Sequence, residues 1–288
     1  MYVLQVNSNA YSNSSVSLLS SATNNPADSI GYYVVSGEYG RFSIAGDYTC
    51  SAGHQVYVYA RGGNSGYDGS NSAIGLMASL GACPEAGNFA TAAPFVFVNE
   101  VTTVAAAYAM AGIATDATHA VTAPAASIGM TNAADLANIA TGVANAALPS
   151  KPEIHAPQTK IHTLANILSA CINSSSPNSI SCTALFSNAR SNGTSGTTPD
   201  DTAAAAINIA RNPHANIAAL YRLQPRLCLS SIILSPVNSN VKLSLHETGD
   251  IHVESEGTAA SERDQRMHQG RYGVCQSCRT PVPEPAPD

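Results

Sequence analysis

The sequence contains no tryptophan, and aromatic residues make up only 6% of its 288 residues. Charged residues are also scarce: they make up 11% of the chain, against about 25% in an average soluble domain. So few aromatic rings disfavour an aromatic-lined catalytic pocket or a carbohydrate platform. The formal net charge is −6, from 13 Lys and Arg against 19 Asp and Glu. This balance argues against a nucleic-acid partner, which would require a basic face.

Several sequence signatures are missing as well. No apolar run reaches the roughly 18 residues that a membrane-spanning helix needs, because Thr, Asn, Asp and Gly interrupt the Ala-rich stretches. A nucleophile elbow requires G-x-S-x-G, and the runs 63–67 and 193–197 lack the last glycine. There is no Gly-Lys dipeptide for a phosphate loop, and no G-x-G-x-x-G follows a strand. We therefore expect no catalytic, cofactor-binding or metal-binding residues and no cofactor.

The C-terminal segment contains a cluster of residue types that bind metals. His246, His252 and three nearby acids form a local group, but the H-E-x-x-H pair of a helical zinc site is missing. Cys275 and Cys278 have metal or redox spacing, yet no second C-x-x-C completes a zinc site. A solvated polar segment, with a tail disulfide or free thiols, is the simpler interpretation. A metal-binding module remains an alternative.

The chain contains seven cysteines, and four of them suggest two disulfides. Cys171 and Cys182 bracket the turn-forming run NSSSPNSIS, so they suit a short closed loop. Cys50 and Cys83 each lie beside a turn signal and form a second candidate pair. The alternative is buried free thiols in a cytosolic protein. The sequence assigns no partner to Cys228.

The surface composition points to export. Up to residue 150 the only basic side chains are Arg41 and Arg61, and Ser, Thr, Asn, Gly and Ala dominate. Cytosolic proteins usually keep Lys- and Glu-rich surfaces for solubility. We therefore expect an extracellular, periplasmic or cell-surface location, where disulfides persist. No signal peptide opens the chain, so in an exported protein we expect the true N-terminus to be missing.

Short runs rich in β-branched and aromatic residues predict a β-rich segment over residues 1–62. Turn-forming residues separate these runs at the spacing of a β-sandwich. The predicted strands are 2–6, 15–19, 32–35, 41–44 and 56–59. Residues 95–98 predict another strand, whereas 72–80 fit either a short helix or a buried strand.

Residues 63–223 predict an Ala-rich, mostly helical domain. Helical spacing of apolar residues begins at Val101. Thr131, Thr159 and Thr198 are the expected N-caps of three further helices, the first of which extends to Pro149. Residues 216–221 predict a last short helix. The fold class is therefore α+β.

Residues 224–288 differ in kind from the rest. Charges cluster only here, and the chain ends in the proline-rich run TPVPEPAPD. We expect a disordered tail without its own core, and we expect residues from about 242 onward to be the first removed by limited proteolysis.

The order of the segments between residues 56 and 223 resembles a known group of proteins. VYVYARGGNSG, NSAIGLMASLGAC, PFVFVNEVTTVAAAYAMA, IHTLANILSACINS and PDDTAAAAINIARNP are similar to the region ahead of the propeller in secreted bacterial NHL-repeat proteins. The upstream GEYGRFSI and YTC resemble the prealbumin-like β-sandwich that opens such chains. The resemblance implies an extracellular module and matches Cys50, Cys83, Cys171 and Cys182, but it transfers no functional residue. The propeller itself is absent, so the chain fits either a truncated or frame-shifted product or a protein without one.

These observations favour a non-catalytic extracellular structural or interaction module, with a protein or cell-envelope partner. Glu100, Asp135, Asp200 and Asp201 each lie near an expected helix start, where a carboxylate complements the helix dipole. The histidines show no acid–base pairing in the sequence; outside the tail they are His54, His119, His155, His162 and His214. A hydrolase-type enzyme with an unrecognisable site is the alternative.

Overall fold

The computed structural model describes residues 1–7, 14–44, 48–64, 69–121, 124–224 and 242–244. These described residues all belong to one compact unit. The predicted tail, including Cys228, His246, His252, Cys275 and Cys278, lies outside the described residues apart from positions 224 and 242–244.

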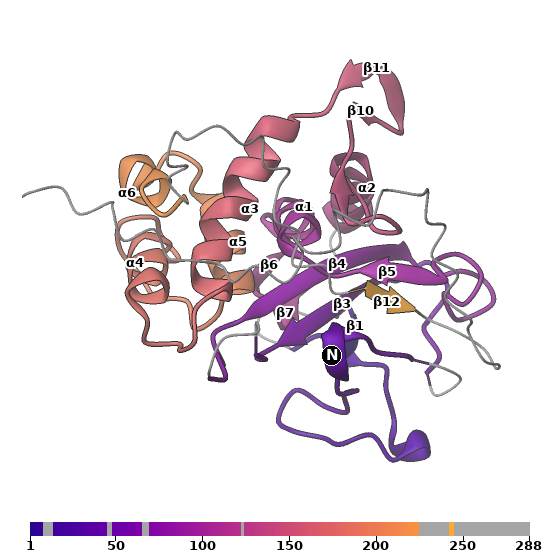
Figure 1. The fold of residues 1–288 in the computed structure, drawn as a ribbon. Helices are drawn as coiled ribbons and strands as arrows, with labels where there is room; N and C mark the ends of the chain where they lie inside the picture. Colours follow the sequence, from indigo (N-terminus) through magenta and orange to yellow (C-terminus); the bar gives the residue numbers. More distant parts are fainter. Residues whose placement is uncertain (8–13, 45–47, 65–68, 122–123, 225–241, 245–288) are drawn as a thin grey trace, which may run out of the picture. The chain divides into compact units, whose positions relative to one another are not determined.

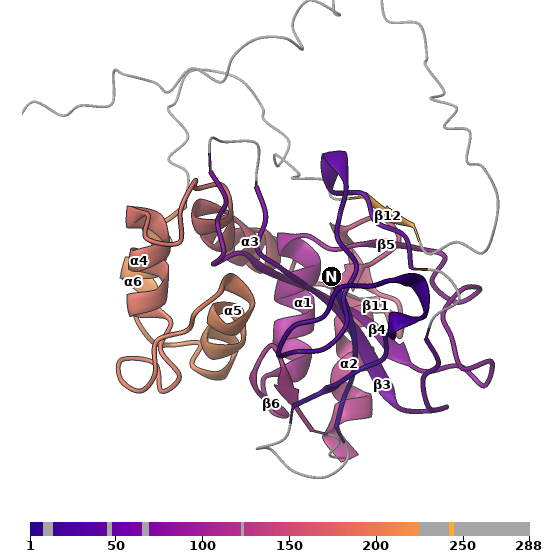
Figure 2. The ribbon, with the colours of Figure 1, turned by 90° about the horizontal axis from the view of Figure 1, so that it is seen from below.

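A four-stranded antiparallel sheet lies at the centre of this unit, in the order β2–β1–β3–β4. Its strands are β1 (Tyr2–Gln5), β2 (Val16–Ser17), β3 (Gln55–Arg61) and β4 (Gly75–Ala82). The first six residues of β3 are all buried, because both faces of this strand are covered. Figures 1 and 2 show the helices on one face of the sheet and the segment 18–44 on the other.

The remaining strands form two-stranded pairs around the sheet. They are β5 (Phe95–Phe97) with β12 (Lys242–Ser244), β6 (Ala114–Asp116) with β7 (His119–Ala120), β8 (Ala137–Asn138) with β9 (Val143–Ala144), and β10 (Ala147–Leu148) with β11 (Lys151–His155). Two 3-10 turns, Ser21–Thr23 and Glu38–Gly40, lie in the segment before β3.

Helix α1 (Glu100–Met110) is the centre of the helical layer. It contacts β4, α2 (Pro124–Leu136), α3 (Gln158–Ile172) and α5 (Thr202–Arg211). All of its residues except Tyr108 are buried, because the sheet covers one side of α1 and helices cover the others. Helices α4 (Ile180–Asn188) and α6 (Ile217–Tyr221) complete this layer beside α3 (Figure 1). Among the described residues, no helix has both the length and the hydropathy needed to cross a bilayer.

The structure confirms the α+β class and several predicted elements. Strands occur within 2–6, 15–19, 56–59 and 95–98, and residues 75–82 resolve the ambiguous segment as a strand. Residues 32–35 and 41–44 form no strand; Tyr32 makes only an isolated bridge to Ala27. The pairing of β3 with β4 joins residues on both sides of position 62. The prealbumin-like sandwich and the boundaries at 62 and 223 stay predictions.

Three predicted helix starts are wrong. Helix α2 begins at Pro124 and ends at Leu136, and the short strands β8 and β9 replace the expected continuation to residue 149. Thr159 lies inside α3, which begins at Gln158. Helix α5 begins at Thr202 with Asp201 as its N-cap, three residues later than Thr198–Pro199 indicated. The short helix expected at 216–221 is confirmed as α6.

Candidate functional site

Two disulfides connect the elements around the sheet, and both match the predicted pairs. Cys50 and Cys83 join the segment before β3 to the end of β4, with Cα atoms 6.0 Å apart. Cys171 and Cys182 join α3 to α4, with Cα atoms 4.4 Å apart. Asn71, which is fully buried, donates a hydrogen bond from Nδ2 to the Cys171 carbonyl at 2.9 Å. The second disulfide is thus tied to the β3–β4 connection.

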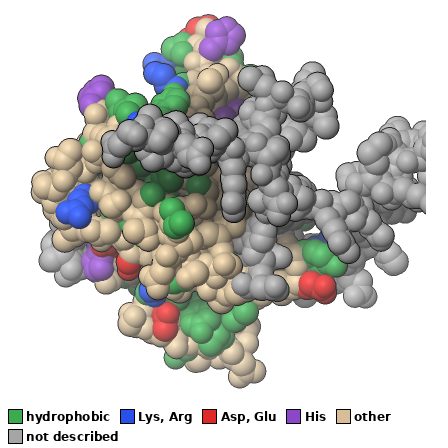
Figure 3. Space-filling view, turned by 60° about the vertical axis from the view of Figure 1, so that its left-hand side comes forward, with side chains coloured by type: hydrophobic (Ala, Val, Ile, Leu, Met, Phe, Trp, Pro, Cys, Tyr) green, Lys and Arg blue, Asp and Glu red, His purple; other side chains and the backbone are tan. Residues whose placement is uncertain are grey.

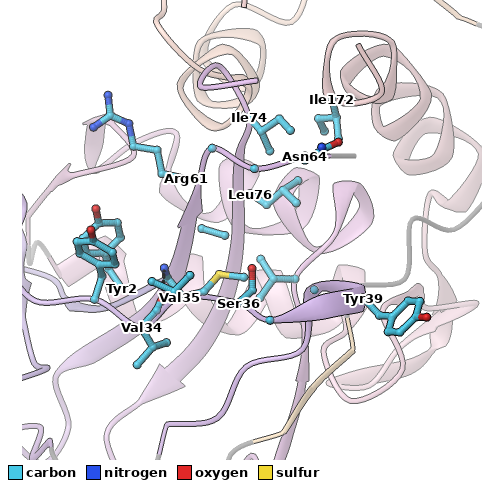
Figure 4. Close-up of a pocket in the computed structure, with 18 of the residues that line it drawn as sticks. Tyr2, Val34, Val35, Ser36, Tyr39, Arg61, Asn64, Ile74, Leu76 and Ile172 are labelled. Carbon is cyan, nitrogen blue, oxygen red and sulfur yellow. Dashed lines mark hydrogen bonds between the residues drawn. The ribbon is translucent and has the colours of Figure 1, made fainter. Parts of the chain in front are cut away.

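A hollow of about 900 Å³ opens beside the sheet, where β1 and β4 begin and β3 ends. This volume lies in the upper part of the roughly 300–1,000 Å³ range of ligand sites. Its apolar lining comes from distant parts of the chain, as Figure 4 shows: Tyr2, Val34, Val35, Ile74, Leu76, Val98 and Ile172. The hollow can therefore receive a large apolar group.

Two large side chains at the hollow are strongly exposed. Val35 is 70% exposed and Tyr39 is 78% exposed. Tyr39 has φ of 60°, in the left-handed region that residues other than glycine rarely adopt. In Figure 4, Tyr39 lies on the opposite side of the hollow from Tyr2 and Arg61. Neither apolar contacts nor backbone preference explains why a tyrosine occupies this position.

Asp28 and Arg61 are two of the charged residues that line the hollow, and Glu38, next to Tyr39 in the sequence, is a third. Arg61 makes no ion pair within 4 Å among the described residues. The Tyr2 hydroxyl donates to Asp28 Oδ2 at 2.7 Å. Desolvation raises the pKa of Asp28, but hydrogen bonds from Tyr2 and from the backbone of Ile30 and Gly31 outweigh it and lower the pKa. The hollow therefore has charged groups beside a mainly apolar wall.

A buried tyrosine–carboxylate pair lies deeper in the unit. The Tyr59 hydroxyl donates to Asp201 Oδ2, while Asp201 Oδ1 accepts from the Ala204 amide at 2.7 Å. Burial raises the pKa of Asp201, and burial with the neighbouring Asp201 raises that of Tyr59. Only glycine fits at position 75, because a Cβ there would lie 2.6 Å from Asp201 Cγ. The pair fixes α5 on the sheet, and both of its residues are buried.

Three polar side chains converge at the surface near the β6–β7 turn. His119 Nδ1 lies 2.9 Å from both carboxylate oxygens of Asp116, and His119 Nε2 lies 3.2 Å from Ser14 Oγ. Partial burial raises the pKa of Asp116, but hydrogen bonds from His119 and Thr118 outweigh it, so the pKa is lowered. The His119 and Asp116 side chains are 35% and 40% exposed, and Ser14 is also exposed.

The acids singled out in the sequence occupy structural positions. Glu100 begins α1 after the N-cap Asn99, and Asp201 caps α5, as a helix-start role requires. Asp135 lies at the end of α2 instead of near a start. Its carboxylate accepts hydrogen bonds from the Ser150 amide and hydroxyl, which fixes the turn before β11.

The sequence analysis missed the partners of His119. Asp116 and His119 are three residues apart, and the run D-A-T-H at a turn was a local signal that could have identified the pair. Ser14 is 105 residues from His119, and only the tertiary structure brings it there. Among the described residues, no group of three His, Cys, Asp or Glu side chains could hold a metal ion.

A scan against protein-family models and searches of curated proteins and of solved structures found no match. The functional argument therefore depends on the geometry of the chain itself.

Proposed function

We propose that the chain is an exported interaction module that binds a protein partner through the hollow beside the sheet. The observation that carries the proposal is the exposed Tyr39, with left-handed backbone, at the side of an apolar hollow. Non-glycine residues in this region cost free energy and cluster at functional sites. Tyrosine is also enriched in protein interfaces, where its ring buries apolar area and its hydroxyl stays hydrogen-bonded.

The shape of the hollow favours a protein over a small molecule. The strongly exposed side chains of Val35 and Tyr39 line the hollow together with a wall formed by the buried Ile74 and Leu76. A small ligand would be covered by the wall and would leave these two side chains in water. A partner that inserts one apolar side chain against Ile74 and Leu76, which are already buried, and covers the surroundings would also bury Val35 and Tyr39. Arg61 can pair with acidic groups of such a partner.

The location outside the cytosol is part of the same proposal. Two disulfides support an oxidising compartment, because cytosolic thiols are kept reduced. Few charges on the surface agree with this: in the face shown in Figure 3, acidic and basic side chains occur in small, separate groups. The likeness to the pre-propeller region of secreted NHL-repeat proteins, with its prealbumin-like sandwich, remains an untested part of the proposal.

Site-specific photo-crosslinking tests the proposal. A photoreactive benzoylphenylalanine replaces Tyr39 in the full chain, expressed in its native cells, and the matched control carries it at Ile180, which is 90% exposed and is not among the residues lining the hollow. We expect a discrete protein adduct at position 39 and none at position 180. Equal adducts at both positions, or none at position 39, would contradict the proposal.

A further inference from the structure

Ser14, His119 and Asp116 are linked by hydrogen bonds in the order of a nucleophile, a base and a carboxylate that orients the base. A carboxylate only accepts hydrogen bonds, so the proton between Asp116 and His119 belongs to Nδ1 of the imidazole. In its neutral form, the ring with its proton on Nδ1 presents Nε2 as an acceptor, 3.2 Å from the Ser14 hydroxyl. The direction of each hydrogen bond follows from the chemistry of Asp116, and this direction is the one that nucleophilic catalysis requires.

The carboxylate and the ring are held in place by the turn between β6 and β7. Asp116 Oδ1 accepts hydrogen bonds from the Thr118 amide at 2.8 Å and from the His119 amide at 3.0 Å. The Thr118 hydroxyl adds a third at 2.9 Å. Because these bonds fix the Asp116 side chain independently of the imidazole, His119 meets an acceptor that is already oriented.

The serine is anchored to the core and not only to its neighbours in sequence. The Asn7 side chain donates to the Ser14 carbonyl at 2.9 Å, and the Ser15 amide donates to the Thr118 carbonyl at 2.7 Å. Ser15 Oγ in turn accepts from the hydroxyl of Tyr57, a fully buried residue of β3. A residue 105 positions from His119 is therefore fixed beside it by hydrogen bonds to the sheet and to the turn.

We propose that Ser14, His119 and Asp116 form an acyl-transfer site for activated esters, a second activity beside partner binding. Ser14 Oγ attacks the ester carbonyl carbon while its proton passes to His119 Nε2. The bond between carbonyl carbon and leaving oxygen then breaks, and His119 returns the proton to that oxygen. Water hydrolyses the acyl-serine by the same route, which releases the acid and restores Ser14.

The openness of the site selects the class of ester. All three side chains are partly in water, and none of them is among the residues that line the hollow beside the sheet. Esters with a good leaving group, such as aryl esters, need the least help with the departing oxygen. We therefore expect the site to accept aryl esters of short acyl groups and not to discriminate between different acyl groups.

A fluorophosphonate probe and p-nitrophenyl acetate test the proposal on the full chain. We expect the probe to modify Ser14, as mapped by peptide mass spectrometry. Ser14→Ala should abolish both labelling by the fluorophosphonate and acetylation of residue 14 by p-nitrophenyl acetate. Asp116→Asn and His119→Gln should each slow acylation by about 10²-fold, the lower end of what general-base catalysis contributes. The exposed Ser187→Ala variant of α4 is the matched control and should behave like wild type.

Circular dichroism and thermal unfolding of each variant separate a chemical effect from misfolding. Addition of imidazole to a folded His119→Ala variant should restore part of the acylation, because the site is open to solvent; a purely structural histidine would give no rescue. The proposal is overturned by labelling that is equal in wild type and Ser14→Ala, or by Asp116→Asn acylating at the wild-type rate. Labelling of Ser14 by the probe does not require a partner at the hollow. A negative result for the acyl-transfer site therefore leaves the proposal of partner binding intact, and the reverse also holds.

Discussion

Asp201 combines three structural roles in one buried side chain. It caps α5 through the Ala204 amide, accepts the Tyr59 hydroxyl of β3, and covers Gly75 of β4. Burial of a carboxylate disfavours its charged form, and this raises the pKa of Asp201. The same residue that fixes helix to sheet therefore makes the stability of the fold depend on pH.

The sign of this dependence follows from linkage. With a raised pKa, the folded state binds more protons than the unfolded state between the ordinary carboxyl pKa near 3.8 and the higher folded value. The contribution of Asp201 to the free energy of unfolding therefore decreases as pH rises through that window. In Asp201→Asn, which keeps an acceptor for the Ala204 amide, this contribution should vanish. Urea unfolding at several pH values measures it; an unchanged pH profile would contradict the assignment.

Truncation of the same residue separates the cap from the charge. Asp201→Ala removes the N-cap and leaves the Tyr59 hydroxyl without its buried acceptor. We expect a loss of about 1–3 kcal/mol in the free energy of unfolding, from a lost cap and one unsatisfied polar group. Tyr59→Phe in the Asp201→Ala background should recover part of the loss. A truncation without measurable cost would show that the pair does not hold α5.

Helix α1 and helix α2 approach so closely that one glycine is required. A Cβ at Gly129 of α2 would lie 2.4 Å from the Ala109 carbonyl oxygen of α1. Gly129→Ala should therefore destabilise the unit by about 1–3 kcal/mol, because overpacking outweighs the better helix propensity of alanine. Gly112, with no atom within 4 Å of its Cβ position, is the matched control. In thermal unfolding, Gly112→Ala should have a higher melting temperature than Gly129→Ala. The reverse order of melting temperatures would contradict this packing.

The errors in element boundaries have a physical origin. Thr198 followed by Pro199 is a sound local signal for a helix start. The helix nevertheless begins after Asp201, because the Asp201 carboxylate also accepts a hydrogen bond from Tyr59. In addition, the Thr202 hydroxyl hydrogen-bonds to both the amide and the carbonyl of Gly75. The class, the central strands and α1 could be predicted because their apolar patterns are local. The partner of His119 could not, because Ser14 reaches it only through contacts with β3 and the β6–β7 turn.

The two disulfides act on the whole unit by restricting the unfolded chain. Cys50–Cys83 closes a separation of 33 residues and Cys171–Cys182 one of 11. Loop-closure entropy gives about 3.7 kcal/mol for the first and about 2.8 kcal/mol for the second. Double Cys→Ala substitution of Cys50 and Cys83 should therefore lower the free energy of unfolding more than double Cys→Ala substitution of Cys171 and Cys182. Denaturant unfolding of the two variants measures the order, and a larger loss at 171 and 182 would show that native-state packing dominates.

The most direct measurement of the binding role is the affinity of the partner captured at Tyr39 for two matched variants of the full chain. Val35→Glu places a carboxylate at the apolar hollow, and Val143→Glu places one on β9, outside its lining; the two valines are 70% and 44% exposed, so neither substitution disturbs the core. We predict that Val35→Glu raises the dissociation constant by about tenfold or more, as substitution at an interface hot spot does. Val143→Glu should leave the dissociation constant unchanged. Wild-type affinity in Val35→Glu would contradict binding at the hollow.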